Sequence, residues 1–176
     1  MVRCSRRLLQ YLWRLMVIKL IWAEAEGGLI GAEGSLPWHN GTDLNYFKNQ
    51  TTGGIVVMGH TTWKSIGCKP LKNRVNIILT HKDEIEGYDG EEVYIANNVE
   101  EILDFYEHSD KDLWIIGGAS VYKQFIPYCE EFIVSLIEGD YSGDTYFTDM
   151  DEYRKPENVI VTLKGEGFVA THYRKE

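Results

Sequence analysis

Cysteine is scarce in this 176-residue chain, and so are long hydrophobic runs. The three cysteines, Cys4, Cys68 and Cys129, are odd in number and form no Cys-x-x-Cys pair. This pattern excludes a disulfide framework and a zinc motif as organising features, and it favours a reducing compartment. No apolar run reaches the length of about 20 residues that a membrane-spanning helix needs. We therefore expect a cytoplasmic protein with no metal site and no membrane partner.

Positive charge is also scarce. The chain has 18 Lys and Arg residues against 27 Asp and Glu residues, for a formal charge of −9. A general nucleic-acid-binding surface needs a broad basic footprint, so a nucleic-acid partner is not expected. Any anionic ligand must instead be held by a local group of donors. The 44% hydrophobic and 26% charged composition is ordinary for one globular domain of this length.

The first fifteen residues differ from the rest of the chain. Residues 1–15 contain four arginines and no acidic residue, which leaves 14 basic against 27 acidic residues from Met16 onward, a formal charge of −13. A signal peptide with a cleavage site near 23–25 is one interpretation, although Arg14 interrupts its apolar stretch, and an Arg-rich transit peptide is another. We predict that Met16 is the functional start, that 1–15 is a leader outside the fold, and that 16–176 forms the domain.

From Met16 onward, short apolar segments rich in β-branched residues alternate with short helical patterns. This alternation predicts an α/β fold with a mainly parallel sheet, closed by an antiparallel hairpin. Thr42 is expected to cap the first helix. The predicted strands are 17–23, 55–58, 74–80, 93–96, 112–116, 132–137, 159–163 and 168–173, and the predicted helices are 42–50, 59–66, 99–108 and 117–125.

Two strands run into glycine and then into a helix. One junction is at Gly59, and the other is at Gly117 and Gly118. Free backbone N–H groups at such helix starts bind phosphate, and glycine permits close approach. A glycine after a strand is also an ordinary turn residue, and the chain lacks both GxGxxG and GxxxxGK[ST]. Two such junctions in one small domain favour a dinucleotide ligand.

A polar group follows two neighbouring predicted strands. His60 and Thr61 come after one strand, and His81 and Lys82 come after the next. Solvated loops explain such residues equally well. The functional interpretation is a pocket for an additional phosphate, which needs hydroxyl and cationic donors.

Asp43 lies in the first turn of its predicted helix, where a favourable interaction with the helix dipole is a sufficient reason for an aspartate. If the side chain instead points inward, burial raises its pKa and suits it to proton chemistry. Trp22, Trp38 and Phe47 are either core residues or the wall for a flat aromatic ligand. Arg74 is either a surface residue at the start of a strand or a ligand donor.

Read in order, these features resemble dihydrofolate reductase. The matching segments are LIWAEAEGGLIGAEGSLPW, TDLNYFK, VVMGHTTWKSIG, PLKNRVNIILT, IIGGASVY and GDTYF, and the resemblance runs from Met16 to about Phe147. It implies a single α/β domain with a predominantly parallel eight-stranded sheet, a C-terminal antiparallel strand and four flanking helices. It also implies an adenosine-binding subregion at about 54–110.

The resemblance implies an NADPH-dependent oxidoreductase that reduces 7,8-dihydrofolate to tetrahydrofolate, by hydride transfer to C6 and protonation at N5. Such an enzyme supports one-carbon metabolism and binds antifolates, and we expect it to be monomeric. Aspartate rather than glutamate at position 43 is similar to bacterial or phage members.

By the same resemblance, Asp43 would bind the amidine edge of the pterin. Trp38 would hold an ordered water, and Ser135 would belong to the hydrogen-bond network of Asp43. Arg74 would pair with the α-carboxylate of the glutamate tail, because its planar fork suits carboxylates. The residues implied for the substrate wall are Ile21, Trp22, Ala23, Leu36, Leu44, Phe47, Ile66, Leu71, Ile116 and Tyr122.

For the cofactor, the resemblance places the pyrophosphate at the two glycine junctions and the 2′-phosphate near Thr61, His81 and Lys82. It also implies a cis peptide between Gly117 and Gly118. The full implied set is Ala23, Ile30, Gly31, Ser35, Gly59, His60, Thr61, Thr62, Leu79, Thr80, His81, Lys82, Gly117, Gly118, Ala119, Ser120, Val121 and Tyr122. Residues 27–36 resemble the loop that closes over nicotinamide, and Asp144 lies in the segment that braces it.

The chain departs from the family pattern at His60, where arginine is usual, in the linker CKPLKN, and after Phe147, where the tail is short and predicts a clipped final hairpin. Two alternatives stay open. One is the pyrimidine reductase of riboflavin biosynthesis, which shares the fold and takes a phosphorylated ribityl substrate. The other is a non-catalytic NADPH-binding module. The Leu-Pro-Trp segment, Asp43 and Arg74 favour the reduction of dihydrofolate.

Overall fold

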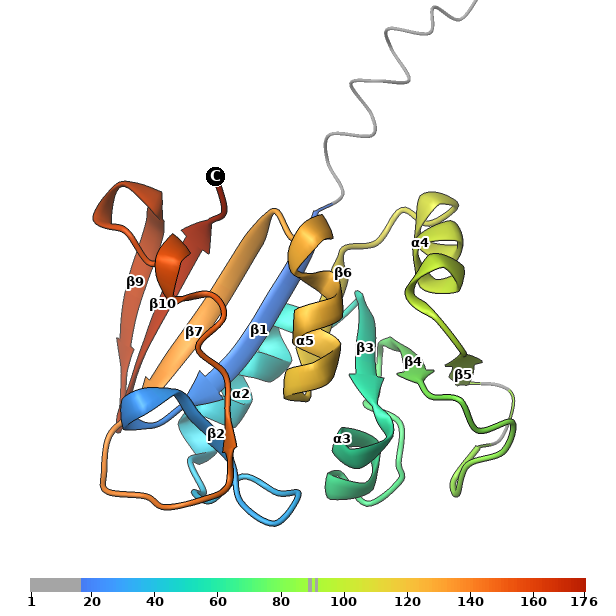
Figure 1. The fold of residues 1–176 in the computed structure, drawn as a ribbon, viewed down its shortest axis with the longest axis horizontal. Coiled ribbons are helices and arrows are strands. Elements are labelled where there is room, and N and C mark those ends of the chain that lie inside the picture. Colours follow the sequence, from blue (N-terminus) through green and yellow to red (C-terminus); the bar gives the residue numbers. More distant parts are fainter. Residues whose placement is uncertain (1–16, 89, 91) are drawn as a thin grey trace, which may run out of the picture.

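The computed structural model describes residues 17–88, 90 and 92–176. The predicted leader at 1–15 lies outside these described residues. The main sheet has eight strands in the order β5-β4-β3-β6-β1-β7-β10-β9 (Figure 1). Its strands are β1 (Ile18–Glu24), β3 (Ile55–Gly59), β4 (Val75–Leu79), β5 (Val93–Ala96), β6 (Leu113–Gly117), β7 (Glu131–Ile137), β9 (Val159–Gly165) and β10 (Phe168–Arg174).

The strand pairing confirms the predicted fold class. Strands β5, β4, β3, β6, β1 and β7 pair in parallel, while β10 is antiparallel to both β7 and β9. The helices are α2 (Gly41–Thr51), α3 (His60–Ser65), α4 (Val99–Glu107) and α5 (Ala119–Phe125). All four coincide with predicted helices to within two residues at each end.

Strand alternation divides the core into two layers. Along β1, Leu20 and Trp22 pack with α4 and α5, while Ile21 packs on the opposite face with residues of α2 and α3. Successive side chains of a strand point to opposite faces, so one strand contributes to both layers. In Figure 1, α5 lies in front of the sheet and α2 behind it.

Three details differ from the sequence-based expectations. The helix α2 begins one residue earlier than predicted, and its cap is Asn40 rather than Thr42, because the Asn40 side chain accepts the hydrogen bond from the Asp43 N–H. A second sheet of β2 (Leu29–Gly31) and β8 (Thr145–Tyr146) was not predicted. Its strands are too short to carry a periodic signal. Short 3₁₀ turns complete the fold at Glu26–Gly28, Ile126–Tyr128, Asp151–Tyr153 and Pro156–Asn158.

The final hairpin is not clipped, and that prediction was wrong. Strands β9 and β10 each have seven residues, and only Glu166 and Gly167 separate them. Gly167 has φ +72°, a conformation that glycine adopts without strain. The tail is therefore short because its turn is tight, and the sheet keeps its full width.

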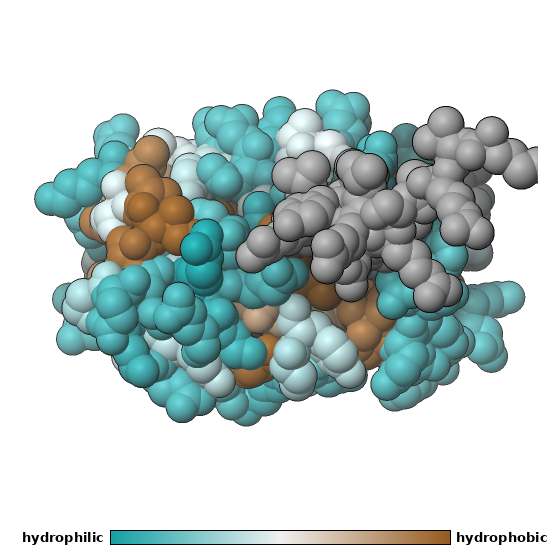
Figure 2. Space-filling model, turned by 90° about the horizontal axis from the view of Figure 1, so that it is seen from above, coloured by the Kyte–Doolittle hydropathy of each residue, from teal (hydrophilic) through white to brown (hydrophobic). Residues whose placement is uncertain are grey.

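The surface is mainly hydrophilic in the view of Figure 2, with a hydrophobic patch on the side of β9. Val159 and Ile160 of this strand are exposed. Among the described residues, no helix combines the length and the apolar composition needed to cross a bilayer.

Candidate functional site

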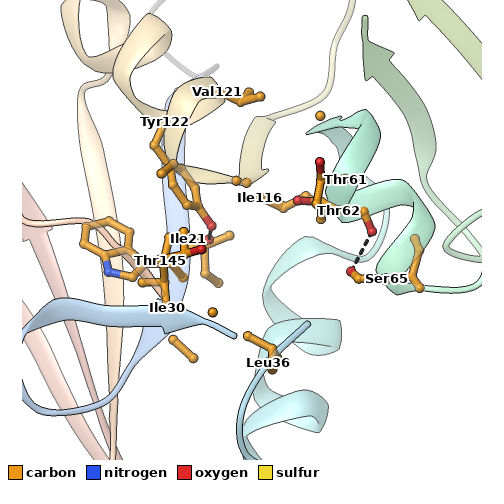
Figure 3. A pocket seen from close by; sticks show the side chains of 18 of the residues that line it. Ile21, Ile30, Leu36, Thr61, Thr62, Ser65, Ile116, Val121, Tyr122 and Thr145 are labelled. Atoms are coloured by element: carbon orange, nitrogen blue, oxygen red, sulfur yellow. Dashed lines mark hydrogen bonds between the residues drawn. The ribbon is translucent and has the colours of Figure 1, made fainter. Parts of the chain in front are cut away.

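A cavity of about 840 Å³ opens at the carboxyl ends of the central strands (Figure 3). Its walls come from β1, the loop before α2, α2 itself, and the two strand–glycine–helix junctions. Ligand sites of open α/β sheets lie at this edge, because loops and helix starts converge there. Of the predicted site residues, all except Trp38 and Lys82 line this cavity.

Asp43 reaches the cavity from the first turn of α2, and only 6% of the residue is exposed. Burial raises the pKa of its carboxyl group, and a hydrogen-bonding interaction with Ser135 opposes that rise in part. A carboxylate that served the helix dipole alone would lie in solvent. The inward-facing alternative of the sequence analysis is therefore the one that this geometry supports.

Arg74 lines the cavity from just before β4, at the amino end of that strand, whereas the glycine junctions follow the carboxyl ends of β3 and β6. Its Nη1 donates to Thr51 Oγ1 at 2.9 Å, and its Nε donates to the Lys72 carbonyl at 3.1 Å. Partial burial lowers the pKa of the guanidinium, which still leaves it charged at neutral pH. The two contacts hold a planar cation at the cavity in a fixed direction.

The two glycine junctions face each other. A Cβ added at Gly59 would lie 3.0 Å from Val121 Cγ2, and one added at Gly118 would lie 3.6 Å from Thr62 Oγ1. Neither α3 nor α5 has a side-chain cap, so the first N–H groups of both helices stay available to a ligand. The predicted cis peptide between Gly117 and Gly118 is confirmed. This close pair of uncapped starts fits a pyrophosphate.

Of the four polar residues predicted to surround an additional phosphate, three line the cavity and one does not. His60, Thr61 and His81 line the cavity, but Lys82 is exposed and does not. The pKa of His60 is lowered, first by partial desolvation and then by the charges of Lys82 and Lys64. His60 is therefore mostly neutral in the free protein at pH 7, where the family pattern has a permanently charged arginine.

The inner wall is aromatic. The Tyr122 hydroxyl donates to the Ile21 carbonyl at 3.0 Å, and both residues face the cavity (Figure 3). The Trp22 ring packs against Tyr122 at 5.7 Å and against Phe147 at 5.1 Å between centroids. Full burial raises the pKa of the Tyr122 hydroxyl, so this hydroxyl stays protonated.

The segment around Asp144 braces the loop before Leu36, as the sequence analysis expected. Asp144 Oδ2 accepts a hydrogen bond from the Glu33 N–H at 3.0 Å, and its own N–H donates to the Gly31 carbonyl at 3.1 Å. The Thr145 hydroxyl donates to the other carboxylate oxygen at 2.7 Å. These hydrogen bonds keep the pKa of Asp144 below its ordinary value.

Trp38 lies close to the cavity but contributes no wall to it. The residue is 8% exposed, and its indole packs edge-on against Tyr141 with centroids 5.4 Å apart. The buried Nε1 has no acceptor within the described part of the chain. Buried N–H groups are nearly always satisfied, so this donor points to a further partner at the site.

Several lining residues were missed by sequence reasoning. Tyr46 follows Asp43 by three residues on the same helix, a spacing that could have indicated a shared face. Asn97 follows β5 directly, and a polar residue at that end of a strand is the same signal that identified His81. The missed set is Gly34, Tyr46, Lys48, Ser65, Asn97, Gln124 and Thr145.

Comparisons with known proteins agree with this geometry. The chain is 36% identical over 159 residues to a dihydrofolate reductase of Mycoplasma genitalium, covering 89% of this chain and 96% of that one. It is 37% identical over 127 residues to that of Lactococcus lactis, covering 72% and 75%. A solved Enterococcus faecalis dihydrofolate reductase, complexed with NADP(H) and RAB-propyl, superposes with a TM-score of 0.77 and 33% identity, covering 91% and 97%. The family model described as dihydrofolate reductase matches residues 17–161, and the chain therefore belongs to the dihydrofolate reductase family, whose members are NADPH-dependent oxidoreductases.

Proposed function

We propose that this cavity holds both ligands of the family's reaction, with NADPH at the glycine junctions and 7,8-dihydrofolate between Asp43 and Arg74. The observation that carries the proposal is the buried Asp43 carboxylate, which faces the same cavity as two uncapped helix starts. A carboxylate suits the cationic edge of a protonated pterin, and N–H groups suit a pyrophosphate.

The residues present fit NADPH. At the first junction, glycine at position 59 leaves room beside the start of α5, where an added Cβ would lie only 3.0 Å from Val121 Cγ2. Thr61, Thr62 and His60 add polar groups beside this junction. When bound, NADPH supplies the hydride that reduces the pterin. The protein contributes the orientation of the two ligands and the charges around them.

Asp43 binds and polarises the pterin in this proposal, and it does not deliver the proton to N5 itself. Burial raises the pKa of its carboxyl group, and a cationic edge of the ligand would favour the ionised form. Ser135 stabilises the ionised form, since hydrogen bonding to a carboxylate favours its charge. The unpartnered Nε1 of Trp38 is assigned to an ordered water near the pterin.

Arg74 recognises the glutamate tail of the substrate. Its position is held by Thr51 and Lys72, so the guanidinium is oriented before the ligand arrives. A planar guanidinium pairs with a carboxylate through two parallel hydrogen bonds. The substrate wall between Asp43 and Arg74 is apolar, and it is formed by Ile21, Leu36, Leu44, Phe47, Ile66, Leu71 and Ile116.

One assay tests this function. The purified chain is mixed with NADPH, and the loss of NADPH absorbance is followed after 7,8-dihydrofolate is added. We expect oxidation that depends on dihydrofolate and is blocked by an antifolate. Oxidation only with the phosphorylated ribityl pyrimidine would identify the riboflavin-pathway reductase. Binding of NADPH with no oxidation in either case would identify a non-catalytic module.

We further propose that the chain acts as a monomer in the cytoplasm. All cavity walls named above come from one chain, so the site is complete without a partner. Sedimentation across a range of concentrations tests the monomer, and fractionation of the native cells tests the compartment.

A further inference from the structure

Glu24 is a buried carboxylate that the proposed function does not use. It ends β1 and is 4% exposed. Arg154 Nη1 contacts its Oε1 at 2.6 Å, and Nη2 contacts its Oε2 at 2.8 Å. A buried carboxylate is unfavourable unless it is paired and hydrogen-bonded, and this bidentate ion pair satisfies both carboxylate oxygens. The pair joins β1 to a segment 130 residues later in the chain.

The same carboxylate holds Trp22. The indole Nε1 donates to Glu24 Oε2 at 2.8 Å. The guanidinium of Arg154 lies over the Trp22 ring, 5.6 Å from its centroid. A buried indole N–H needs an acceptor, and a cation over the ring face adds attraction. Glu24 therefore fixes the ring at its edge, and Arg154 fixes it at its face.

Trp22 in turn shapes the cavity. It lines the wall between Ile21 and Ala23 and packs against Tyr122, which also lines the wall. Behind the wall, Trp22 stacks on Phe132 with centroids 5.8 Å apart. If the indole turned, the wall beside Tyr122 would change its shape.

We propose that Glu24 and Arg154 are positioning residues that hold Trp22 in the orientation required for ligand binding. Through them, the segment that follows β8 sets the affinity of the cavity for dihydrofolate. The inference rests on the proposed function for the identity of that ligand. Without Arg154, Glu24 is left buried without a counter-charge, which favours its turning toward solvent and away from the Trp22 N–H.

The test replaces Arg154 with methionine in the full chain. We expect the Kd and KM for dihydrofolate to rise about tenfold while kcat changes much less, because a loosened wall weakens binding in the ground state and in the transition state alike. The Kd is measured by fluorescence titration without NADPH. The matched control is Lys19→Met, which breaks the 2.9 Å pair of Lys19 with Asp112 at the other end of β1. It should lower the unfolding midpoint and leave the Kd unchanged.

A double-mutant cycle tests whether Arg154 acts through Trp22. Trp22→Phe removes the N–H and is expected to weaken binding by itself. In that background, Arg154→Met should add less than about a twofold change, since coupled residues are not additive. The full tenfold effect in both backgrounds would overturn the proposal. So would an Arg154→Met protein that is less stable but binds dihydrofolate normally.

A spectroscopic readout separates this inference from the proposed function. The near-UV circular dichroism of the ligand-free chain, minus that of Trp22→Phe, reports the orientation of Trp22. Arg154→Met should lose this difference signal, and its retention would contradict the proposal whether or not the chain reduces dihydrofolate. If Arg154→Met does not fold, Arg154→Lys is used in its place, because lysine keeps the positive charge but cannot form the bidentate pair. It should then show a smaller loss of the same signal, and an unchanged signal would overturn the proposal.

Discussion

The side-chain oxygen of Asn40 accepts a hydrogen bond from the backbone N–H of Asp43 at 2.9 Å. The residue that caps α2 thus holds the backbone of the residue that we assign to the pterin. The Asn40 amide group also donates to the carbonyl of Glu166 at 3.0 Å, in the turn of the final hairpin. The cap therefore connects the assigned carboxylate to the C-terminal edge of the sheet.

Asn40→Ala should lower the free energy of unfolding by about 1 kcal/mol, because it leaves an N–H of α2 without its capping acceptor. It should also raise the KM for dihydrofolate, since Asp43 loses its backbone anchor. Urea unfolding and steady-state kinetics check the two effects. Asn40→Asp keeps the capping oxygen and is the control that should restore most of the stability.

Asp43→Asn should reduce kcat by about 10²-fold or more at pH 7, since an electrostatic interaction with the transition state is lost. The amide has the same shape but no charge. A lower pH, at which more of the substrate is protonated in solution, should rescue part of the activity. Turnover close to that of the wild type at pH 7 would refute the assignment.

The same substitution should stabilise the fold at neutral pH. The folded-state pKa of Asp43 is raised, so ionisation disfavours the folded state once the pH exceeds the unfolded-state value near 3.9. The stabilisation by Asn should therefore grow as the pH rises through the folded-state pKa, and it should vanish at low pH, where Asp43 is protonated. Denaturation midpoints at pH 3 and pH 7 measure it.

Arg74→Leu should weaken dihydrofolate binding by about 2–5 kcal/mol, because the carboxylate of the tail loses its charged partner. NADPH binding should change little, since Arg74 lies away from the glycine junctions. Separate titrations with the two ligands check this selectivity. An equal loss for both ligands would mean that Arg74 has a structural role through Thr51.

NADPH should bind more tightly at pH 6 than at pH 8. The pKa of His60 is lowered in the free protein, and the nearby 2′-phosphate should raise it in the complex, so binding takes up a proton. Affinity then rises as the pH falls through the bound-state pKa of His60. NADH lacks this phosphate and should show little pH dependence. Parallel profiles for the two cofactors would mean that His60 does not meet the phosphate, and His60→Arg should flatten the NADPH profile.

The shortened chain 16–176 should retain the activity and stability of the full chain, because residues 1–15 match no part of the family pattern. Turnover and thermal melting of the two proteins test this prediction. A large drop in either quantity would place the leader in the fold.

Local patterns were sufficient for most of the fold. The alternation of β-branched segments with short helical patterns predicted the main sheet and all four helices. This was possible because the hydrophobic periodicity of a strand or a helix is visible within a short stretch of sequence. The tight Glu166–Gly167 turn was misjudged, because tail length alone does not distinguish a short loop from short strands. For the site, spacing placed His60, Thr61 and Arg74 at the correct strand ends.

The tertiary structure decided which side chains are buried and which residues far apart in the sequence are in contact. The sequence alone determined that Asp43 begins a helix and that two glycine junctions follow two strands. Only the packing of α2 on the sheet decided that Asp43 is buried with a raised pKa. Only the fold brings Arg154 onto Glu24 and Trp22, and no local pattern marks such a pair. Arg154 and Glu24 are separated by 130 residues in the sequence, so their ion pair forms only when the folded chain brings them together.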